Sequence, residues 1–229
     1  MCLGPRPLLF EADTAFAPAA LPRSRRSPVG FHFGSKVSVE GGGHPPALRE
    51  GVLELDKHVK IDASKFHACP REYVALGEIA RALRLCPDSV VGVGRARIEV
   101  GDPEGQAPHD AVSRLTIFAG GSQGPTATLL FRFEPLAPSS VPLLAVAKVG
   151  ALERGRFGTS MSIAFPRFAE GNGSIVSFGF GLRRRAPGDR AGVMSASCPD
   201  GHLAFHFFGR FADGTRLAGS TVRTCKAAP

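Results

Sequence analysis

The chain contains no tryptophan and a single tyrosine, Tyr73, although 17 of its 229 residues are phenylalanine. Protein surfaces that stack on sugars or nucleobases commonly use Trp and Tyr, because those rings combine apolar area with a polar group. Aromatic content that consists almost entirely of phenylalanine therefore favours a packed core over a stacking surface.

Long hydrophobic runs are also missing. No apolar run approaches the roughly 18 residues that a membrane-spanning helix needs, and the longest, such as residues 143–147, have the length of a strand. Residues 7–10 are too short for the hydrophobic core of a signal peptide, and Glu11 and Asp13 follow at once. We therefore expect no signal peptide within this sequence.

Motifs for phosphate or metal binding are incomplete. Gly92 and Gly94 follow a valine run, but a dinucleotide-binding loop needs a third glycine and the start of a helix. His202 and His206 lie on a predicted strand, where residues four apart are about 13 Å from each other and cannot share one ion. The sequence consequently assigns no cofactor and no metal ligand.

A hydrolase motif is missing as well. Ser160 is not part of a Gly-x-Ser-x-Gly turn, and His109 and Asp110 belong to a separate segment. No residue is therefore assigned a catalytic role from the sequence.

Four of the five cysteines form two pairs that are close in sequence, Cys69 with Cys86 and Cys198 with Cys225, while Cys2 stands alone. Their spacing matches no common metal-binding finger, so we predict two disulfides and an oxidising compartment. A zinc site of His67, Cys69 and Cys86 is the alternative for the first pair, and it has no assigned fourth ligand.

Strand signals extend over most of the chain. Short apolar segments alternate with polar residues, and turns separate them every 8–12 residues or so. From residue 29 onward this pattern predicts an all-β, antiparallel β-sandwich of about eleven or twelve strands. Cys86-Pro87-Asp88 and Cys198-Pro199-Asp200 recur about half a chain apart. Two similar sandwich halves, 29–137 and 138–229, are therefore an open alternative.

Two segments depart from this strand pattern. Residues 1–28 are rich in proline and arginine, which predicts a disordered tail. Residues 71–85 have apolar residues at spacings of three and four, which predicts a helix. Fifteen helical residues would rise about 22 Å, whereas bridged Cα atoms lie within about 7 Å. A Cys69–Cys86 disulfide thus requires a shorter helix or a chain that doubles back.

The last predicted hairpin allows its faces to be assigned. Asp213-Gly214 supplies the turn. The period of two places Phe205, Phe207 and Phe211 on one face, which we expect to be core. His206 and Phe208 are expected on the opposite, partly solvated face.

Positive charge is concentrated near the C-terminus. The net charge is +8, and residues 181–229 contain eight basic and three acidic side chains. Arg183, Arg184 and Arg185 are consecutive. We expect a solvated loop here that makes at most a weak contact with a polyanion or a cell surface, since no nucleic-acid-binding motif accompanies it.

A series of short motifs extends over residues 30–226. They are Gly43-His44-Pro45-Pro46-Ala47-Leu48, Leu55-Asp56-Lys57, Ile61-Asp62, Cys86-Pro87, Val91-Gly92-Val93-Gly94, Phe118-Ala119-Gly120-Gly121, Gly155-Arg156-Phe157-Gly158, Cys198-Pro199-Asp200-Gly201, Phe211-Ala212-Asp213-Gly214-Thr215 and Cys225. In this order they resemble a family of uncharacterised secreted proteins from GC-rich bacteria. The resemblance implies an exported, mostly β protein with paired cysteines, and it implies no activity. This chain lacks the apolar export signal of the family and has Phe66-His67-Ala68 before Cys69, where a Gly-Leu-Pro-like turn is expected.

Two functional hypotheses follow. The first is an exported or cell-surface protein, non-catalytic, with a structural or ligand-binding role. The second is a hydrolase of an extracellular polymer, whose carboxylates come together only in the fold. A hydrolase of that kind should place two carboxylates facing each other in a cleft, roughly 5–10 Å apart.

Overall fold

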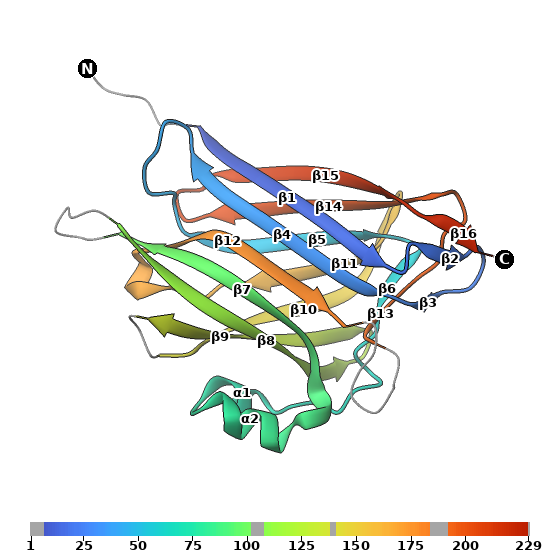
Figure 1. Cartoon of the computed structure of the whole chain (residues 1–229), viewed down its shortest axis with the longest axis horizontal. Coiled ribbons are helices and arrows are strands. Elements are labelled where there is room, and N and C mark those ends of the chain that lie inside the picture. The colour runs from blue at the N-terminus through green and yellow to red at the C-terminus, as the bar shows by residue number, and fades with distance from the viewer. Residues whose placement is uncertain (1–6, 102–107, 138–140, 184–191, 229) are drawn as a thin grey trace.

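One curved sheet of eleven strands dominates the computed structural model, which describes residues 7–101, 108–137, 141–183 and 192–228. The strand order is β1-β4-β12-β7-β8-β9-β10-β11-β5-β14-β15, and all neighbouring strands are antiparallel. The sheet curls until its edge strands β1 and β15 approach each other, so the fold is a nearly closed barrel (Figure 1).

The strands of this sheet are 8 to 15 residues long. In chain order they are β1 (Leu8–Ala17), β4 (Gly30–Val39), β5 (Leu48–Asp56), β7 (Val90–Val100), β8 (His109–Gln123), β9 (Thr126–Ala137), β10 (Leu143–Arg154), β11 (Phe157–Ala164), β12 (Gly173–Leu182), β14 (His202–Phe211) and β15 (Arg216–Thr224). Two small sheets lie at one end of the barrel (Figure 1). They consist of β3 (Ser27–Pro28), β13 (Met194–Ala196) and β6 (Val59–Ile61), and of β2 (Ala20–Pro22) with β16 (Lys226–Ala228).

The interior of the barrel is filled with phenylalanine. Successive side chains of a strand point to opposite faces, and one face of each strand here supplies large apolar side chains. Their rings contact each other across the barrel, as in the edge-to-face pair of Phe131 and Phe180 with centroids 5.3 Å apart. One interior cavity among these side chains has a volume of only about 40 Å³. The barrel is therefore a packed core and not an open lumen.

The predicted all-β, antiparallel architecture is confirmed, but the predicted sandwich is wrong. The eleven strands form one continuous hydrogen-bonded sheet and do not separate into two sheets. Alternation predicts one apolar face, which a sandwich and a barrel both need, so the pattern cannot distinguish them. Register shifts in several ladders allow the sheet to bend. Strands of 29–137 and 138–229 also intermix, because β12 lies between β4 and β7, so the two halves form no separate sandwiches.

The predicted N-terminal tail is wrong from residue 8 onward. Strand β1 pairs with β4 along its whole length, from Leu8 opposite Val39 to Ala17 opposite Gly30. Prolines flank β1 and obscured its alternation of apolar and acidic residues. Residues 1–6 lie outside the described part of the chain.

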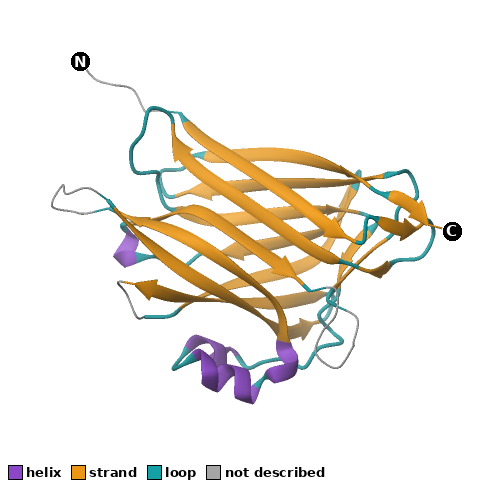
Figure 2. Ribbon diagram, viewed as in Figure 1, coloured by secondary structure: helices purple, strands orange, loops and turns teal. Residues whose placement is uncertain are grey.

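The predicted helix over 71–85 is broken into α1 (Arg71–Ala75) and α2 (Ile79–Leu85), shown in purple in Figure 2. Gly77, with φ of 71°, lies in the left-handed region between them, which glycine adopts readily. The chain thereby doubles back and brings the Cα atoms of Cys69 and Cys86 to 5.6 Å. The face toward the sheet is formed by Val74 and Ala82, while much of the predicted apolar stripe is exposed.

A buried arginine holds this helical segment against the outside of the barrel. Arg132 on β9 has a side chain that is 1% exposed. Its guanidinium donates to the carbonyl oxygen of Val74 at 2.6 Å and to that of Gly77, and it pairs with Glu134. Carbonyl oxygens at the end of a short helix are thus satisfied by a charged donor.

The predicted faces of the last hairpin are confirmed. Phe205, Phe207 and Phe211 are at most 5% exposed, and His206 is only half-buried on the outer face. Phe207 contacts the rings of Phe10 and Phe33. It therefore links β14 to the strand at the opposite edge of the sheet.

We expect Phe207→Ala to lower the free energy of unfolding by about 3–5 kcal/mol, because it leaves a cavity in a close-packed core. Val222→Ala on β15 is the control, since Val222 is 58% exposed and should change stability by less than about 0.5 kcal/mol. Denaturant melts measure both values. Equal losses for the two variants would contradict the assigned interior face.

Candidate functional site

The structure forms two disulfides, Cys69–Cys86 and Cys198–Cys225. They are the pairs that the sequence indicates, and they point to an oxidising environment. Because Cys69 and Cys86 are bonded to each other, they are not available as the zinc ligands of the alternative hypothesis. Within the described residues, no group of three or more His, Cys, Asp or Glu side chains could hold a metal ion.

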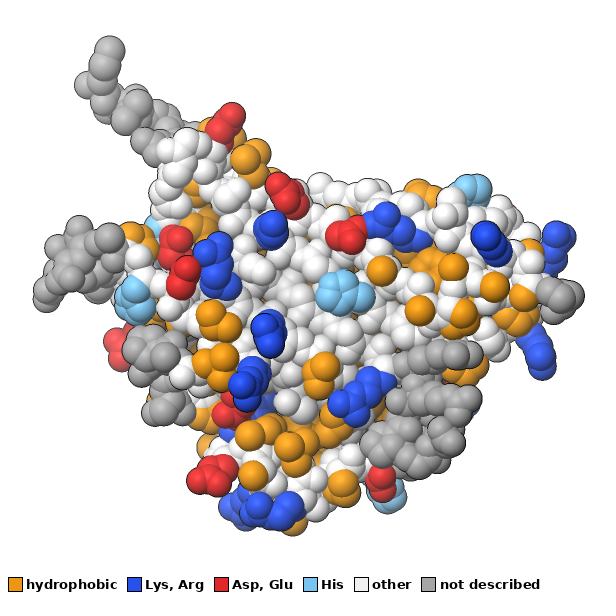
Figure 3. All heavy atoms as spheres, viewed as in Figure 1, with side chains coloured by type: hydrophobic (Ala, Val, Ile, Leu, Met, Phe, Trp, Pro, Cys, Tyr) orange, Lys and Arg blue, Asp and Glu red, His pale blue; other side chains and the backbone are white. Residues whose placement is uncertain are grey.

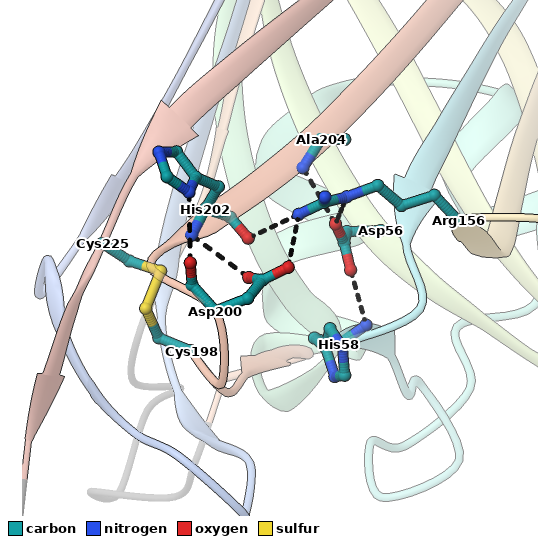
Figure 4. Close-up of polar contacts among 8 residues, drawn as sticks. All are labelled: Asp56, His58, Arg156, Cys198, Asp200, His202, Ala204 and Cys225. Carbon is teal, nitrogen blue, oxygen red and sulfur yellow. Dashed lines mark hydrogen bonds and ion pairs between the residues drawn. A yellow bond between two sulfur atoms is a disulfide. The ribbon is translucent and has the colours of Figure 1, made fainter.

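A fully buried carboxylate lies at the end of β5. The side chain of Asp56 is 0% exposed. One of its oxygens accepts hydrogen bonds from Nε of Arg156 at 2.7 Å and from the amide of Ala204 at 3.0 Å (Figure 4). The other accepts the amide of His58 at 3.0 Å. Each donor belongs to a different turn or strand, so one side chain joins three parts of the barrel end.

Arg156 connects this carboxylate to a second one. Its Nη2 donates to Asp200 at 3.1 Å and to the carbonyl oxygen of His202 at 2.9 Å (Figure 4). The hydrogen bond to Asp56 raises the pKa of Arg156 above its usual value. The pKa of Asp200 is lowered, first by the hydrogen bond from the His202 amide and also by the charge of Arg156. Asp200 is therefore held in its charged form.

These contacts fix the turn between β5 and β6. The amide of Lys57 donates to the carbonyl oxygen of Arg156 at 2.9 Å. Arg26 donates to the carbonyl oxygens of Lys57 and His58 at 2.7 and 3.3 Å. The backbone of this turn is thereby held from both sides, while the Lys57 side chain stays exposed.

A hollow of about 430 Å³ lies beside this turn. Three cationic side chains line it, those of Arg26, Lys57 and Lys60, and Asp62 is the only acid among the described residues of its lining. Asp62 accepts hydrogen bonds from the hydroxyl and amide of Ser64, and the hydroxyl contributes most to lowering its pKa. The hollow therefore has an excess of positive charge, and we call it the basic hollow.

A second, larger hollow of about 810 Å³ lies on the outside of the sheet, over β1, β4, β12 and β7. Its floor includes Gly34, Gly179 and Gly181, and Figure 3 shows this face of the molecule. Lys36 and Arg95 line it together with acids from β1. Cationic and acidic side chains are therefore mixed here, unlike in the basic hollow.

The three consecutive arginines are covered only in part by the structure. Arg183 is exposed, and its amide donates to the carbonyl oxygen of Val91 at 2.9 Å. Arg184 and Arg185 lie outside the described residues. The predicted polyanion contact therefore stays a prediction.

The residues considered for hydrolysis or metal binding do not come together. Asp110 pairs with Arg97. His206 bonds Glu54 through Nδ1 at 3.0 Å, whereas His202 approaches the carbonyl oxygen of Asp200. The two histidines thus have separate partners, as their spacing on a strand predicts.

Sequence reasoning missed the cluster around Asp56. Asp56, Arg156 and Asp200 are distant in the chain, and only the fold brings them together. A signal was present, because each of these residues lies in one of the short motifs, Leu55-Asp56-Lys57, Gly155-Arg156-Phe157-Gly158 and Cys198-Pro199-Asp200-Gly201. Their pairing could not be deduced from one sequence.

No family model, curated protein or solved structure matches the chain. Among the described residues, no helix is long and apolar enough to cross a membrane. The geometry of the two hollows and of the Asp56 cluster is therefore the basis for assigning a function.

We expect Arg156→Met to lower the free energy of unfolding by about 3 kcal/mol, because it leaves the Asp56 carboxylate buried without its cation. Arg97→Met is the control: Arg97 and Asp110 are about half exposed, so the loss should be below about 1 kcal/mol. Adding Asp56→Asn to Arg156→Met should recover part of the loss. Urea melts of the four proteins test this, and equal losses for Arg156→Met and Arg97→Met would contradict it.

We expect acid to remove the contribution of Asp200 to the free energy of unfolding. Its pKa is lowered in the folded protein, so its charged form stabilises the fold above the unfolded pKa of about 3.9. This contribution is lost as the pH falls through the lower folded pKa. The stability difference between the wild type and Asp200→Asn should be constant above about pH 5 and shrink below about pH 4. Urea melts across this pH range measure the stability difference. A difference that grows as the pH falls would contradict a stabilising role of the charged Asp200.

Proposed function

We propose that this chain is an exported, non-catalytic binding protein that holds an anionic group of its ligand in the basic hollow. The observation that carries the proposal is the excess of cationic side chains there. Arg26, Lys57 and Lys60 face one acid, Asp62, which Ser64 already engages.

The cations of the hollow are not neutralised by their own contacts. Arg26 donates to carbonyl oxygens, which are uncharged. In the described chain, Lys57 has no carboxylate within ion-pair distance, and Lys60 interacts with Asp62 only through space. Charges of one sign in a concave site concentrate field lines and attract counter-ions. A phosphate, sulfate or carboxylate group is the chemistry that suits this hollow.

Part of the backbone around the hollow is also held in place before a ligand binds. Its cation Lys57 belongs to the turn that the Asp56 cluster fixes, and the exposed Ser122 adds a polar residue to the lining. A site whose backbone is held before binding loses less entropy when a ligand arrives. The interior of the barrel offers no comparable space, because phenylalanine fills it.

Export is supported by two observations. The two disulfides favour an oxidising compartment. The order of short motifs resembles a family of secreted proteins, and this resemblance remains an expectation. Together they favour a place outside the cell or on its surface.

The hydrolase alternative has weaker support from the described residues. Among its described residues, the basic hollow has a single acid, Asp62. Glu11 and Asp13 line the outer hollow, but they lie on the same strand, and Asp13 is paired with Arg223. Carboxylates that face each other across a cleft would favour hydrolysis, and neither hollow has that arrangement.

Calorimetric titration with inorganic phosphate and sulfate at low ionic strength tests the proposal. The wild type should bind one anion, and Lys57→Gln and Lys60→Gln should each weaken binding about threefold to tenfold, as loss of one charge-assisted contact would. Lys36→Gln is the control with the same charge change, because Lys36 lines the outer hollow. Absence of binding, or equal weakening by Lys36→Gln, would overturn the proposal.

A further inference from the structure

The two edges of the main sheet run in the same direction. Each neighbouring pair in the order β1 to β15 is antiparallel, so strand direction alternates along the eleven strands. An odd number of alternating strands leaves the first and the last parallel to each other, as β1 and β15 are in Figure 1. Within the described residues, no ladder joins β1 to β15. We call the gap between them the seam.

Strand β1 presents unpaired backbone groups to the seam. The carbonyl oxygen of Pro7 accepts from Glu40, on the β4 side, whereas that of Thr14 accepts from Arg223, on the seam side. Backbone groups of alternate residues point to opposite sides of a strand. Those of Leu8, Phe10 and Ala12 therefore face the seam.

Strand β15 does the same from the other side. The carbonyl oxygen of Thr215 accepts from Phe211, on the β14 side, whereas the amide of Lys226 donates to Ala19, beyond the seam. By the same alternation, the backbone groups of Ala218, Ser220 and Val222 face the seam. The seam is thus bordered by two rows of ladder groups without a strand between them.

The seam also leaves part of the interior exposed. Leu8, Phe10 and Ala12 of β1 and Leu217 of β15 pack on the core but are only half-buried. A hollow of about 330 Å³ at the seam is lined by Thr14, which is 1% exposed. The Thr14 hydroxyl has no hydrogen-bond partner among the described residues. A buried hydroxyl without a partner is costly, so the contact between the two edges leaves a polar group unsatisfied here.

One end of the seam is closed. Arg223 bonds the carbonyl oxygen of Thr14 at 2.6 Å and pairs with Asp13. Beyond it, β2 and β16 form a parallel pair, and Cys198–Cys225 anchors the end of β15. The remaining seam-facing backbone groups lie within Leu8–Ala12 on one side and within 216–222 on the other.

We propose that the seam accepts an extended segment of another polypeptide as a twelfth strand, antiparallel to both β1 and β15. One such strand restores the alternation of directions and closes the barrel. It would pair with both rows of backbone groups and place alternate apolar side chains over the exposed interior. Strand addition at a sheet edge is a general mode of peptide recognition, in which main-chain hydrogen bonds supply affinity.

The described strands of a second copy of this chain do not fit the seam in this way. The occupant needs both of its backbone edges free, because it must pair with β1 and with β15. In the described chain, every strand of the main sheet already has at least one side paired. The occupant is therefore a segment that is unpaired in its own protein before it binds.

The probe is a synthetic peptide of about nine residues, a common strand length, that alternates valine with lysine and threonine. Lysine at outward positions would face Glu11 of β1. Because recognition is through the main chain, this generic sequence is sufficient. Fluorescence anisotropy of the labelled peptide should show saturable binding, and the same peptide with proline in place of its central valine should not bind.

Amide hydrogen exchange locates the peptide. We expect it to protect the seam-facing amides of Ala12 and of Ala218 together. Protection at one edge alone, or none, would overturn the proposal. Protection that appears without peptide as the protein concentration rises would overturn it as well, in favour of self-association.

Two matched substitutions complete the test. Ala218→Pro removes an N–H that faces the seam, and edge strands tolerate proline at such positions. It should weaken peptide binding at least about fivefold, as loss of one main-chain hydrogen bond would. Ala218→Val keeps the N–H and should bind as the wild type does. Equal affinity of the two variants for the peptide would refute strand addition at β15.

Discussion

The carboxylate of Asp56 is withdrawn from water, and its need for partners organises one end of the barrel. A buried charge left unpaired costs several kcal/mol. Its partners come from the β10–β11 turn through Arg156, from the β5–β6 turn through the His58 amide, and from β14 through the Ala204 amide. The need to neutralise one charge thus fixes the turn that carries Lys57, and that turn forms a wall of the basic hollow. Stability and the candidate binding site depend on the same contacts.

Closure of the sheet is the second constraint, and it is met only in part. Eleven alternating strands end in parallel edges, so the antiparallel ladder used elsewhere cannot join them. The chain instead joins its edges at one end, through the Arg223 side chain and the short parallel pair of β2 with β16. The disulfide Cys198–Cys225 anchors the end of β15 there. The other end of the seam keeps its backbone groups available.

The sequence predicted local features more successfully than global ones. Alternation correctly identified most strands and the buried face of the last hairpin, because residues such as Phe205 and Phe207 alternate regardless of which sheet they join. The same alternation contains no information on whether the sheet forms a sandwich or curls. Strand β1 was missed because prolines at both ends resemble those of a tail. The basic hollow and the Asp56 cluster were missed because their members are distant in the chain, and their proximity depends on the strand order.

A barrel whose interior is filled by phenylalanine must bind its partners at its ends, its outer face or its open edge. The basic hollow and the seam would bind their partners through different interactions. The basic hollow attracts charge, and that attraction is screened over about 8 Å at physiological ionic strength. The seam offers main-chain hydrogen bonds and apolar contact, on which salt has less effect. Because the Arg223 contact and the β2–β16 pair close one end of the seam, a strand could enter it without disturbing the turn that Asp56 fixes. The fold can therefore combine recognition of an anion with recognition of an extended chain.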